Sequence, residues 1–228
     1  MRLFCFHHAG GGSEMFNAWG RALGPRVEVI AVEIANRERF GTLRELVGEI
    51  DEQLRAQLDG SHAFFGHSFG ALVAYRLASV GEAAGRRLPH ALFVSSYAPP
   101  HLPAPIPVVD RLDDQQLASL LADLGGMPPE LAEWRALRDN AVRSTRIDLR
   151  LCMTDEDGET AALSCPIRAF GGSDDPLVSE SDLRQWGRRT SGEFSVQTFP
   201  GGHFYLCNGP QLFGTLRPLL SGNIHPAA

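Results

Sequence analysis

The sequence contains no lysine, because all 21 of its basic residues are arginine. It therefore lacks the lysine with which a P-loop binds nucleotide phosphates. It also lacks the amine that forms a Schiff base with a carbonyl substrate or with pyridoxal phosphate. P-loop nucleotide-binding enzymes, Schiff-base enzymes and pyridoxal phosphate enzymes are therefore excluded.

Cysteine is scarce, and no two cysteines form a Cys-x-x-Cys pair. The four residues are scattered along the chain, at Cys5, Cys152, Cys165 and Cys207. This spacing favours reduced thiols in a cytoplasmic protein over disulfides or a zinc site. We expect neither a metal nor a cofactor.

Long apolar runs and excess positive charge are also absent. No run approaches the length that spans a membrane, and the first residues lead directly into a strand-like segment, so we expect no signal peptide. The net charge of −6 argues against nucleic acid as a partner.

Within the 228 residues, short apolar runs alternate with helical patterns. One such helix spans 43–58, where Thr42 and Glu45 have the spacing of a capping box. This alternation predicts a single α/β domain over residues 1–228, with a mainly parallel sheet of about six or seven strands flanked by helices. The expected strands are 3–6, 27–32, 63–65, 91–94, 167–170 and 194–199.

The alternation stops between residues 99 and 163. A proline-rich stretch leads into a helical pattern after Asp113, which ends at Gly125 and Gly126, and a further helical pattern follows from Pro129. We interpret residues 99–163 as a helical lid inserted between strands. Most of its apolar side chains should dock on the body, and some should roof a substrate cavity. The candidate substrate-binding residues are Leu117, Leu121, Met127 and Trp134.

The motif Gly66-His67-Ser68-Phe69-Gly70 lies between an apolar run and an alanine-rich helical stretch. Glycines beside a serine at such a junction allow the sharp turn of a nucleophile elbow, which exposes the hydroxyl above a sheet. An ordinary turn with this pattern also occurs by chance. The catalytic interpretation therefore depends on finding a base and an acid downstream.

Both partners follow in the order Ser, Asp, His that is typical of α/β-hydrolases. His203 follows two glycines after the last expected strand, and a loop after strand 167–170 offers Asp174 and Asp175. We choose Asp175, because Pro176 favours an extended backbone at the residue before it and so a side chain that projects from the loop. His67 is better interpreted as a packing or hydrogen-bonding neighbour.

An oxyanion site requires two backbone amides. We expect them from Phe69 and from Ala9, which follows the first strand and precedes Gly10, Gly11 and Gly12. A phosphate site in this glycine run is disfavoured, because the spacing is not Gly-x-Gly-x-x-Gly.

Four stretches together resemble the type II thioesterases of polyketide synthase and nonribosomal peptide synthetase pathways. They are residues 3–11, 64–75, 124–128 and 199–204, and the similarity runs over nearly the whole chain. The resemblance implies an α/β-hydrolase that removes stalled acyl groups from the phosphopantetheine arm of acyl or peptidyl carrier proteins. It implies Ser68 as nucleophile, His203 as base and Asp175 as the acid that orients it. We expect the protein to be a monomer.

The chain departs from this family at a few positions. His7 stands where the family usually has proline, and Phe69 stands where methionine is common. Ala35-Asn36-Arg37 replaces the usual Pro-Gly-Arg. We expect Phe69 to keep its backbone amide in the oxyanion site and its side chain to narrow the acyl channel.

Two other functions remain open on the sequence alone. One is a small-molecule carboxylesterase or lipase of the same fold, since a triad acts on oxygen esters and thioesters alike. The other is a catalytically silent binding protein. If carrier proteins are partners, candidate docking cations are Arg37, Arg39, Arg86 and Arg87.

Overall fold

A parallel six-stranded sheet forms the centre of the molecule in the computed structural model, which describes residues 1–104, 109–126, 134–156, 161–207 and 210–221. The strand order is β2-β1-β3-β4-β5-β6, and every neighbouring pair is parallel. The α/β class and all six expected strands are confirmed. The strands are β1 (Arg2–Phe6), β2 (Glu28–Val32), β3 (His62–His67), β4 (Leu92–Ser95), β5 (Ile167–Gly172) and β6 (Phe194–Phe199).

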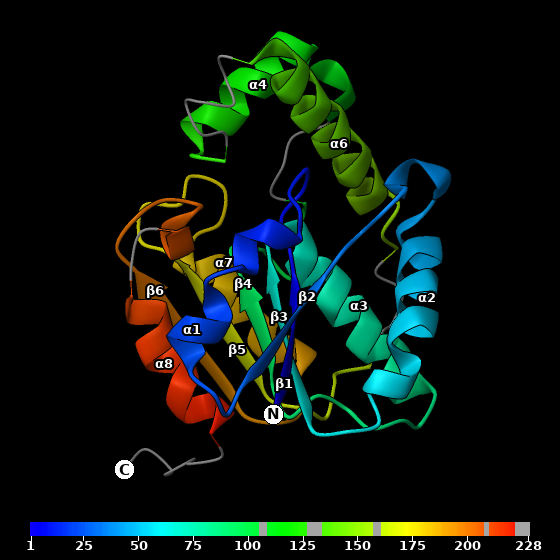
Figure 1. Cartoon of the computed structure of the whole chain (residues 1–228), viewed down its shortest axis with the longest axis vertical. Helices are drawn as coiled ribbons and strands as arrows, with labels where there is room; N and C mark the ends of the chain where they lie inside the picture. Colours follow the sequence, from blue (N-terminus) through cyan, green and yellow to red (C-terminus); the bar gives the residue numbers. More distant parts are fainter. Residues whose placement is uncertain (105–108, 127–133, 157–160, 208–209, 222–228) are drawn as a thin grey trace.

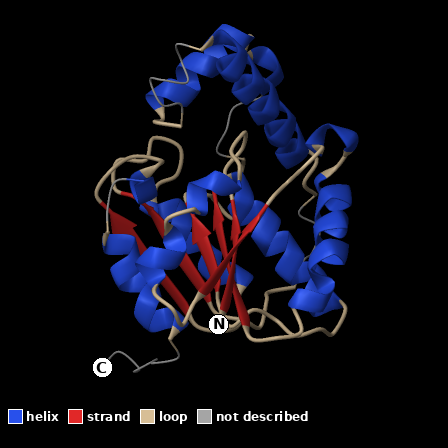
Figure 2. Cartoon of the chain, in the orientation of Figure 1, coloured by secondary structure: helices blue, strands red, loops and turns tan. Residues whose placement is uncertain are grey.

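Helices cover both faces of the sheet (Figures 1 and 2). On one face α1 (Trp19–Leu23) and α8 (Gln211–Leu220) pack over Phe65 and Phe93. On the other face α2 (Leu43–Leu54), α3 (Phe69–Ala83) and α7 (Glu180–Arg184) pack over Phe64 and Val94. Successive residues of β3 and β4 thus pack alternately into the hydrophobic cores on the two faces of the sheet, as expected for a sheet that is buried on both faces.

The capping box at Thr42 and Glu45 is present, and it starts α2 at Leu43. The helix ends at Leu54 and not at Leu58 as expected, because residues Arg55–Gln57 tighten into a 3₁₀ turn. Other 3₁₀ turns are η1 (Ser13–Phe16), η2 (Arg37–Arg39), η4 (Val109–Arg111), η5 (Gln185–Arg189) and η6 (Tyr205–Cys207).

Among the described residues between β4 and β5, two α-helices lie beyond the carboxyl edge of the sheet (Figure 1). A second capping box, from Asp113 and Gln116, starts α4 (Asp114–Asp123), and α6 (Arg135–Met153) packs against it. Both α4 and α6 therefore lie within the helical insertion expected over residues 99–163. The Pro129 pattern begins outside the described residues.

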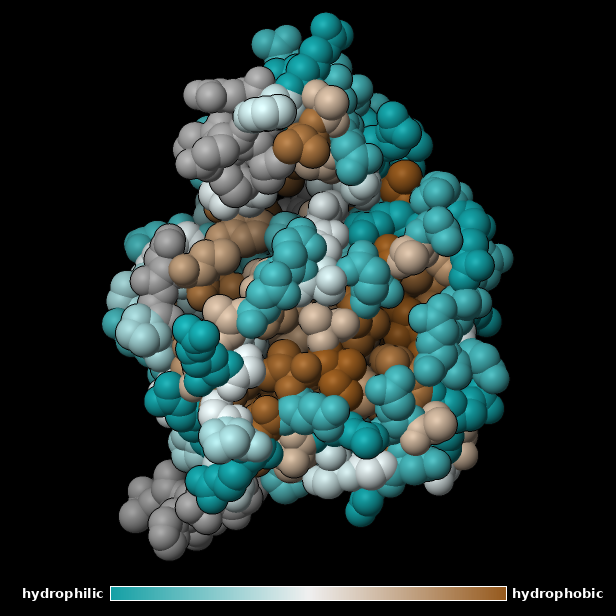
Figure 3. Space-filling model, viewed as in Figure 1, coloured by the Kyte–Doolittle hydropathy of each residue, from teal (hydrophilic) through white to brown (hydrophobic). Residues whose placement is uncertain are grey.

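Hydrophobic surface is exposed across the middle of the body in the view of Figure 3, whereas hydrophilic side chains lie along much of α6. The strand β2 is an edge strand, and Val29, Ile30 and Ala31 in it are only partly covered. Among the described helices, none combines the length and the apolar composition that a membrane crossing requires.

Candidate functional site

Ser68 occupies the turn between β3 and α3. Its backbone has a φ of 54° and a ψ of −123°, a conformation that non-glycine residues rarely adopt. Two hydrogen bonds hold this turn: the Ser68 amide donates to the Ser95 carbonyl at 2.7 Å, and the Ala71 amide donates to the Ser68 carbonyl at 2.8 Å. The strained backbone leaves the side chain at the amino end of α3, beyond the edge of the sheet.

The glycines of the motif are needed for close packing. A Cβ on Gly66 would collide with the backbone of Gly70, and a Cβ on Gly70 would collide with the carbonyls of Phe6 and His7. The helix that carries Ser68 can therefore lie directly against the loop after β1.

We expect Gly70→Ala to lower the free energy of unfolding by about 3 kcal/mol or more, because backbone and not a flexible side chain blocks the added methyl group. Gly81→Ala in the same helix is the matched control, since nothing lies within 4 Å of its Cβ position. Thermal denaturation of both variants checks this expectation. Equal stability of the two variants would contradict the close packing described above.

The side chains of His203 and Asp175 form a hydrogen bond beyond the carboxyl ends of β5 and β6. The Nδ1 atom of His203 lies 2.9 Å from Asp175 Oδ2 and 3.2 Å from Oδ1, and both side chains are almost fully buried. Because a carboxylate only accepts, Nδ1 carries the proton and leaves Nε2 as the basic nitrogen. Asp174 is exposed, and its carboxylate accepts from the Ser173 hydroxyl instead.

The Asp175 carboxylate is stabilised in its charged form. Burial raises its pKa, but hydrogen bonding and charge attraction from His203, with bonds from the Leu177 amide and the Ser96 hydroxyl, outweigh burial and leave the pKa below its usual value. The Leu177 amide donates to Oδ1 at 2.9 Å. An ionised Asp175 is thus held beside His203.

Three further histidines surround the site. The ring of His67 lies 5.3 Å from that of His203, and the His67 Nδ1 atom is 2.9 Å from the Ser95 hydroxyl. Burial lowers the pKa of His7, lowers that of His67 well below its usual range, and lowers that of His8 to about 3. All three are neutral at pH 7, so Asp175 is the charged group that His203 contacts.

The two expected oxyanion donors lie at neighbouring places. Phe69 is the first residue of α3, and Ala9 is in the loop after β1, against which Gly70 packs. Neither amide has a hydrogen-bond partner among the residues that the structure describes. Both amides therefore remain candidate oxyanion donors.

Ser68 and His203 line one small cavity, with a volume of about 30 Å³. Leucines from α4 and α6 form its roof. Sequence reasoning did not single out the α6 residues that line it, because their apolar pattern alone does not distinguish the inner face of an insertion from any other buried helix face. Among the described residues, the lining consists of His8, Ala9, Ser68, Leu117, Leu120, Leu121, Leu124, Thr145, Leu149, Leu177, His203 and Phe204.

The structure places the four expected lid residues differently. Leu117 and Leu121 line the cavity, whereas Met127 lies outside the described residues. Trp134 precedes α6 with 67% of its surface exposed and is absent from the lining. The side chain of Phe69 is buried in the hydrophobic core and is not part of this lining, so its narrowing of the acyl channel stays a prediction.

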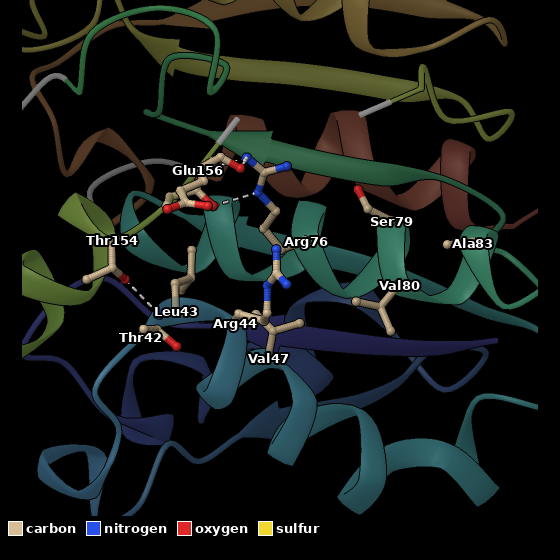
Figure 4. A pocket seen from close by; sticks show the side chains of 11 residues that line it. Thr42, Leu43, Arg44, Val47, Arg76, Ser79, Val80, Ala83, Thr154 and Glu156 are labelled. Atoms are coloured by element: carbon tan, nitrogen blue, oxygen red, sulfur yellow. Dashed lines mark hydrogen bonds and ion pairs between the residues drawn. The ribbon is translucent and has the colours of Figure 1, made fainter. Parts of the chain in front are cut away.

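A larger hollow of about 590 Å³ lies between α2 and α3, further along α3 (Figure 4). Apolar and arginine side chains line it, including Val47, Val80 and Arg76, and the Arg76 guanidinium binds the Asp155 carboxylate there at 2.7 Å. None of the expected catalytic residues reaches this hollow. Over the described part of the chain, no group of three or more His, Cys, Asp or Glu side chains is placed to hold a metal ion.

Three of the four arginines expected to dock a partner pair with carboxylates, whereas Arg87 Nη1 donates to the Asp59 carbonyl at 3.3 Å. Arg37 is buried, and its guanidinium pairs with Asp148. Arg39 pairs with Glu49 at 2.7 Å, and Arg86 pairs with Asp51 at 2.6 Å. The neighbouring carboxylates thus neutralise most of the expected docking charge.

Known proteins match most of this chain. The model of the family described as the thioesterase domain matches residues 1–220. The gramicidin S biosynthesis protein GrsT of Aneurinibacillus migulanus is 31% identical over 212 residues, covering 90% of this chain and 83% of GrsT. Thioesterase PikA5 of Streptomyces venezuelae is 33% identical over 213 residues, covering 90% of this chain and 75% of PikA5.

A solved structure also matches in three dimensions. The type II thioesterase BorB from the borrelidin biosynthetic cluster superposes with a TM-score of 0.86 at 34% identity. The superposition covers 96% of this chain and 92% of BorB. The likeness therefore includes the helices beyond the sheet as well as the sheet itself.

Proposed function

Because the chain belongs to the thioesterase family, we propose that it hydrolyses acyl thioesters on carrier proteins through an acyl-enzyme on Ser68. The family that the sequence resembled is confirmed, as is the α/β-hydrolase fold. The proposed substrate is an acyl or peptidyl group on the phosphopantetheine arm of a carrier protein. The proposed role is to clear stalled or aberrant chains in polyketide or nonribosomal peptide biosynthesis.

One observation supports this chemistry above others: Ser68 opens into the same cavity as His203, and Asp175 holds the His203 Nδ1 proton. In the first half-reaction His203 Nε2 takes the Ser68 proton while Oγ bonds to the thioester carbonyl carbon. The resulting oxyanion accepts hydrogen bonds from the amides of Ala9 and Phe69. The carbon–sulfur bond then breaks, and His203 returns the proton to the leaving thiolate.

In the second half-reaction a water molecule attacks the acyl-serine. His203 takes the water proton, and the same two amides bind the second oxyanion. Collapse of this intermediate breaks the carbon–Oγ bond and returns the proton to Ser68. The products are a carboxylic acid and the free enzyme, so no cofactor enters the balance.

The cavity limits which acyl groups fit. Its volume of about 30 Å³ holds roughly one or two water molecules, so longer acyl chains require the leucines of α4 to move aside. We expect Leu121→Ala to raise kcat/KM for an octanoyl thioester about tenfold relative to an acetyl thioester. Leu137→Ala on the exposed side of α6 is the control. An unchanged octanoyl-to-acetyl ratio in Leu121→Ala would exclude Leu121 from the acyl site.

A panel of substrates tests the proposed function. The same acyl group is offered as a carrier-protein thioester, as a free pantetheine thioester and as a nitrophenyl ester. We expect the highest kcat/KM with the carrier thioester. A strong preference for the nitrophenyl ester would instead favour a small-molecule esterase.

A further inference from the structure

Most backbone groups beside the Ala9 amide are held by hydrogen bonds. The His8 carbonyl accepts from the Gly11 amide at 3.0 Å and from the His7 Nδ1–H at 2.8 Å. Since the His8 carbonyl and the Ala9 amide belong to one planar peptide group, these bonds also fix the direction of the Ala9 N–H. These bonds thus hold the Ala9 amide in one orientation, and Ala9 lines the cavity.

Side chains from other elements form hydrogen bonds with the next two residues of the loop. The Gly10 amide donates to Asp148 Oδ2 at 2.8 Å, and the Gly11 carbonyl accepts from Arg37 Nη2 at 3.1 Å. Arg37 Nη1 donates to the same Oδ2 atom of Asp148. Gly10 has a φ of 76°, which glycine adopts without strain.

These contacts join three separate elements. Asp148 is on α6, Arg37 is in η2 after β2, and the glycines follow β1. Thr145, one turn before Asp148, donates its hydroxyl to the Ala9 carbonyl at 3.5 Å. Two side chains of α6 thus bond to the loop that carries the Ala9 amide.

We propose that Asp148, from the helical insertion, and Arg37, from η2, are positioning residues that hold the oxyanion amide of Ala9. The proposal rests on the function proposed above. Neither side chain lines the cavity, so both act through the loop and not on the substrate. The oxyanion site is complete only while α6 lies where Asp148 reaches the Gly10 amide.

Lowering the pH tests whether the charge of Asp148 matters, which a role in packing alone would not require. Burial raises the pKa of Asp148 to about 6, against the lowering effect of Arg37 and the Gly10 amide. The groups that face Asp148 are Arg37 from η2, Cys152 one turn on along α6, and His7 beyond Arg37. Asp148 is therefore charged at pH 8, and at pH 5 it is protonated in most molecules and loses its ion pair with Arg37.

The first experiment compares Asp148→Asn with the wild type on one acyl thioester. We expect kcat to fall about 10- to 100-fold with KM within about threefold, because a displaced amide weakens transition-state binding more than substrate binding. We also expect the ratio of wild-type to variant kcat to shrink as the pH falls from 8 to 5. A constant ratio over this range would overturn the role of the Asp148 charge.

A double variant separates positioning from stability. Arg37→Met with Asp148→Leu replaces the buried ion pair by apolar side chains of similar size, which commonly restores stability. We expect a melting temperature near that of the wild type and a kcat as low as that of Asp148→Asn. A wild-type kcat in this double variant would overturn the proposal, because the loop would then need no hydrogen bond from α6.

The control is a second arginine–aspartate pair that does not touch the loop. Asp155→Asn breaks the contact with Arg76 beside the hollow of Figure 4 and should change stability without lowering kcat. Ser68→Ala is measured in parallel. If Ser68→Ala retained full activity the proposed function itself would fail, whereas an inactive Ser68→Ala with an unaffected Asp148→Asn would reject the positioning role alone.

Discussion

Replacing Ser68 by alanine is expected to lower kcat for carrier-thioester hydrolysis by at least about 10⁴-fold, because no acyl-enzyme can then form. The fold should persist. Alanine keeps the Cβ atom at a position whose φ of 54° the surrounding backbone already imposes. A continuous thioester assay, with circular dichroism as the check on folding, measures both effects.

The exposed Ser173, on the loop after β5, provides the matched control. Ser173→Ala should retain wild-type turnover. An organophosphonate should label the wild type and Ser173→Ala but not Ser68→Ala. Failure of the wild type to react would support a catalytically silent binding protein.

Replacing Asp175 by asparagine is expected to lower kcat about 10³- to 10⁴-fold. The amide of asparagine can donate to His203 Nδ1, which favours the tautomer with the proton on Nε2. That nitrogen could no longer accept the Ser68 proton. The structure should change little, since the two side chains have the same shape.

Asp174→Asn is the control that separates the two neighbouring carboxylates. Asp174 is exposed and bonds to Ser173, whereas Asp175 bonds to His203. The kcat of Asp174→Asn should therefore equal that of the wild type. The reverse result, with Asp174→Asn inactive and Asp175→Asn active, would show that Asp174 and not Asp175 is the acid that orients His203.

Much of the fold could be predicted from sequence because its signals are local. Each strand is a short apolar run, and the capping boxes at Thr42 and Asp113 mark helix starts with side chains three residues apart. The end of α2 could not be predicted in this way. Leu58 continues the apolar periodicity of the helix, but the backbone had already tightened at Arg55.

In the candidate site, too, some residues could be predicted from the sequence and others could not. Ser68, Asp175 and His203 each follow a strand of one parallel sheet, so topology alone brings them to one edge. The contacts of Arg37 and Asp148 have no such signal, because 111 residues separate them and a charged residue on a helix is ordinarily solvated. Arg37 was for this reason interpreted as a surface cation, and only the packing of α6 against η2 shows that it is buried.

Rapid-quench mass spectrometry of the enzyme can show whether a carrier-bound acyl group passes through Ser68. The enzyme is mixed with an acyl-carrier protein, quenched within one turnover and digested. We predict one added acyl mass, on the peptide that contains Ser68, which forms and decays as free acid appears. Free acid released at the full rate while that peptide stays unmodified would rule out an acyl-enzyme on Ser68.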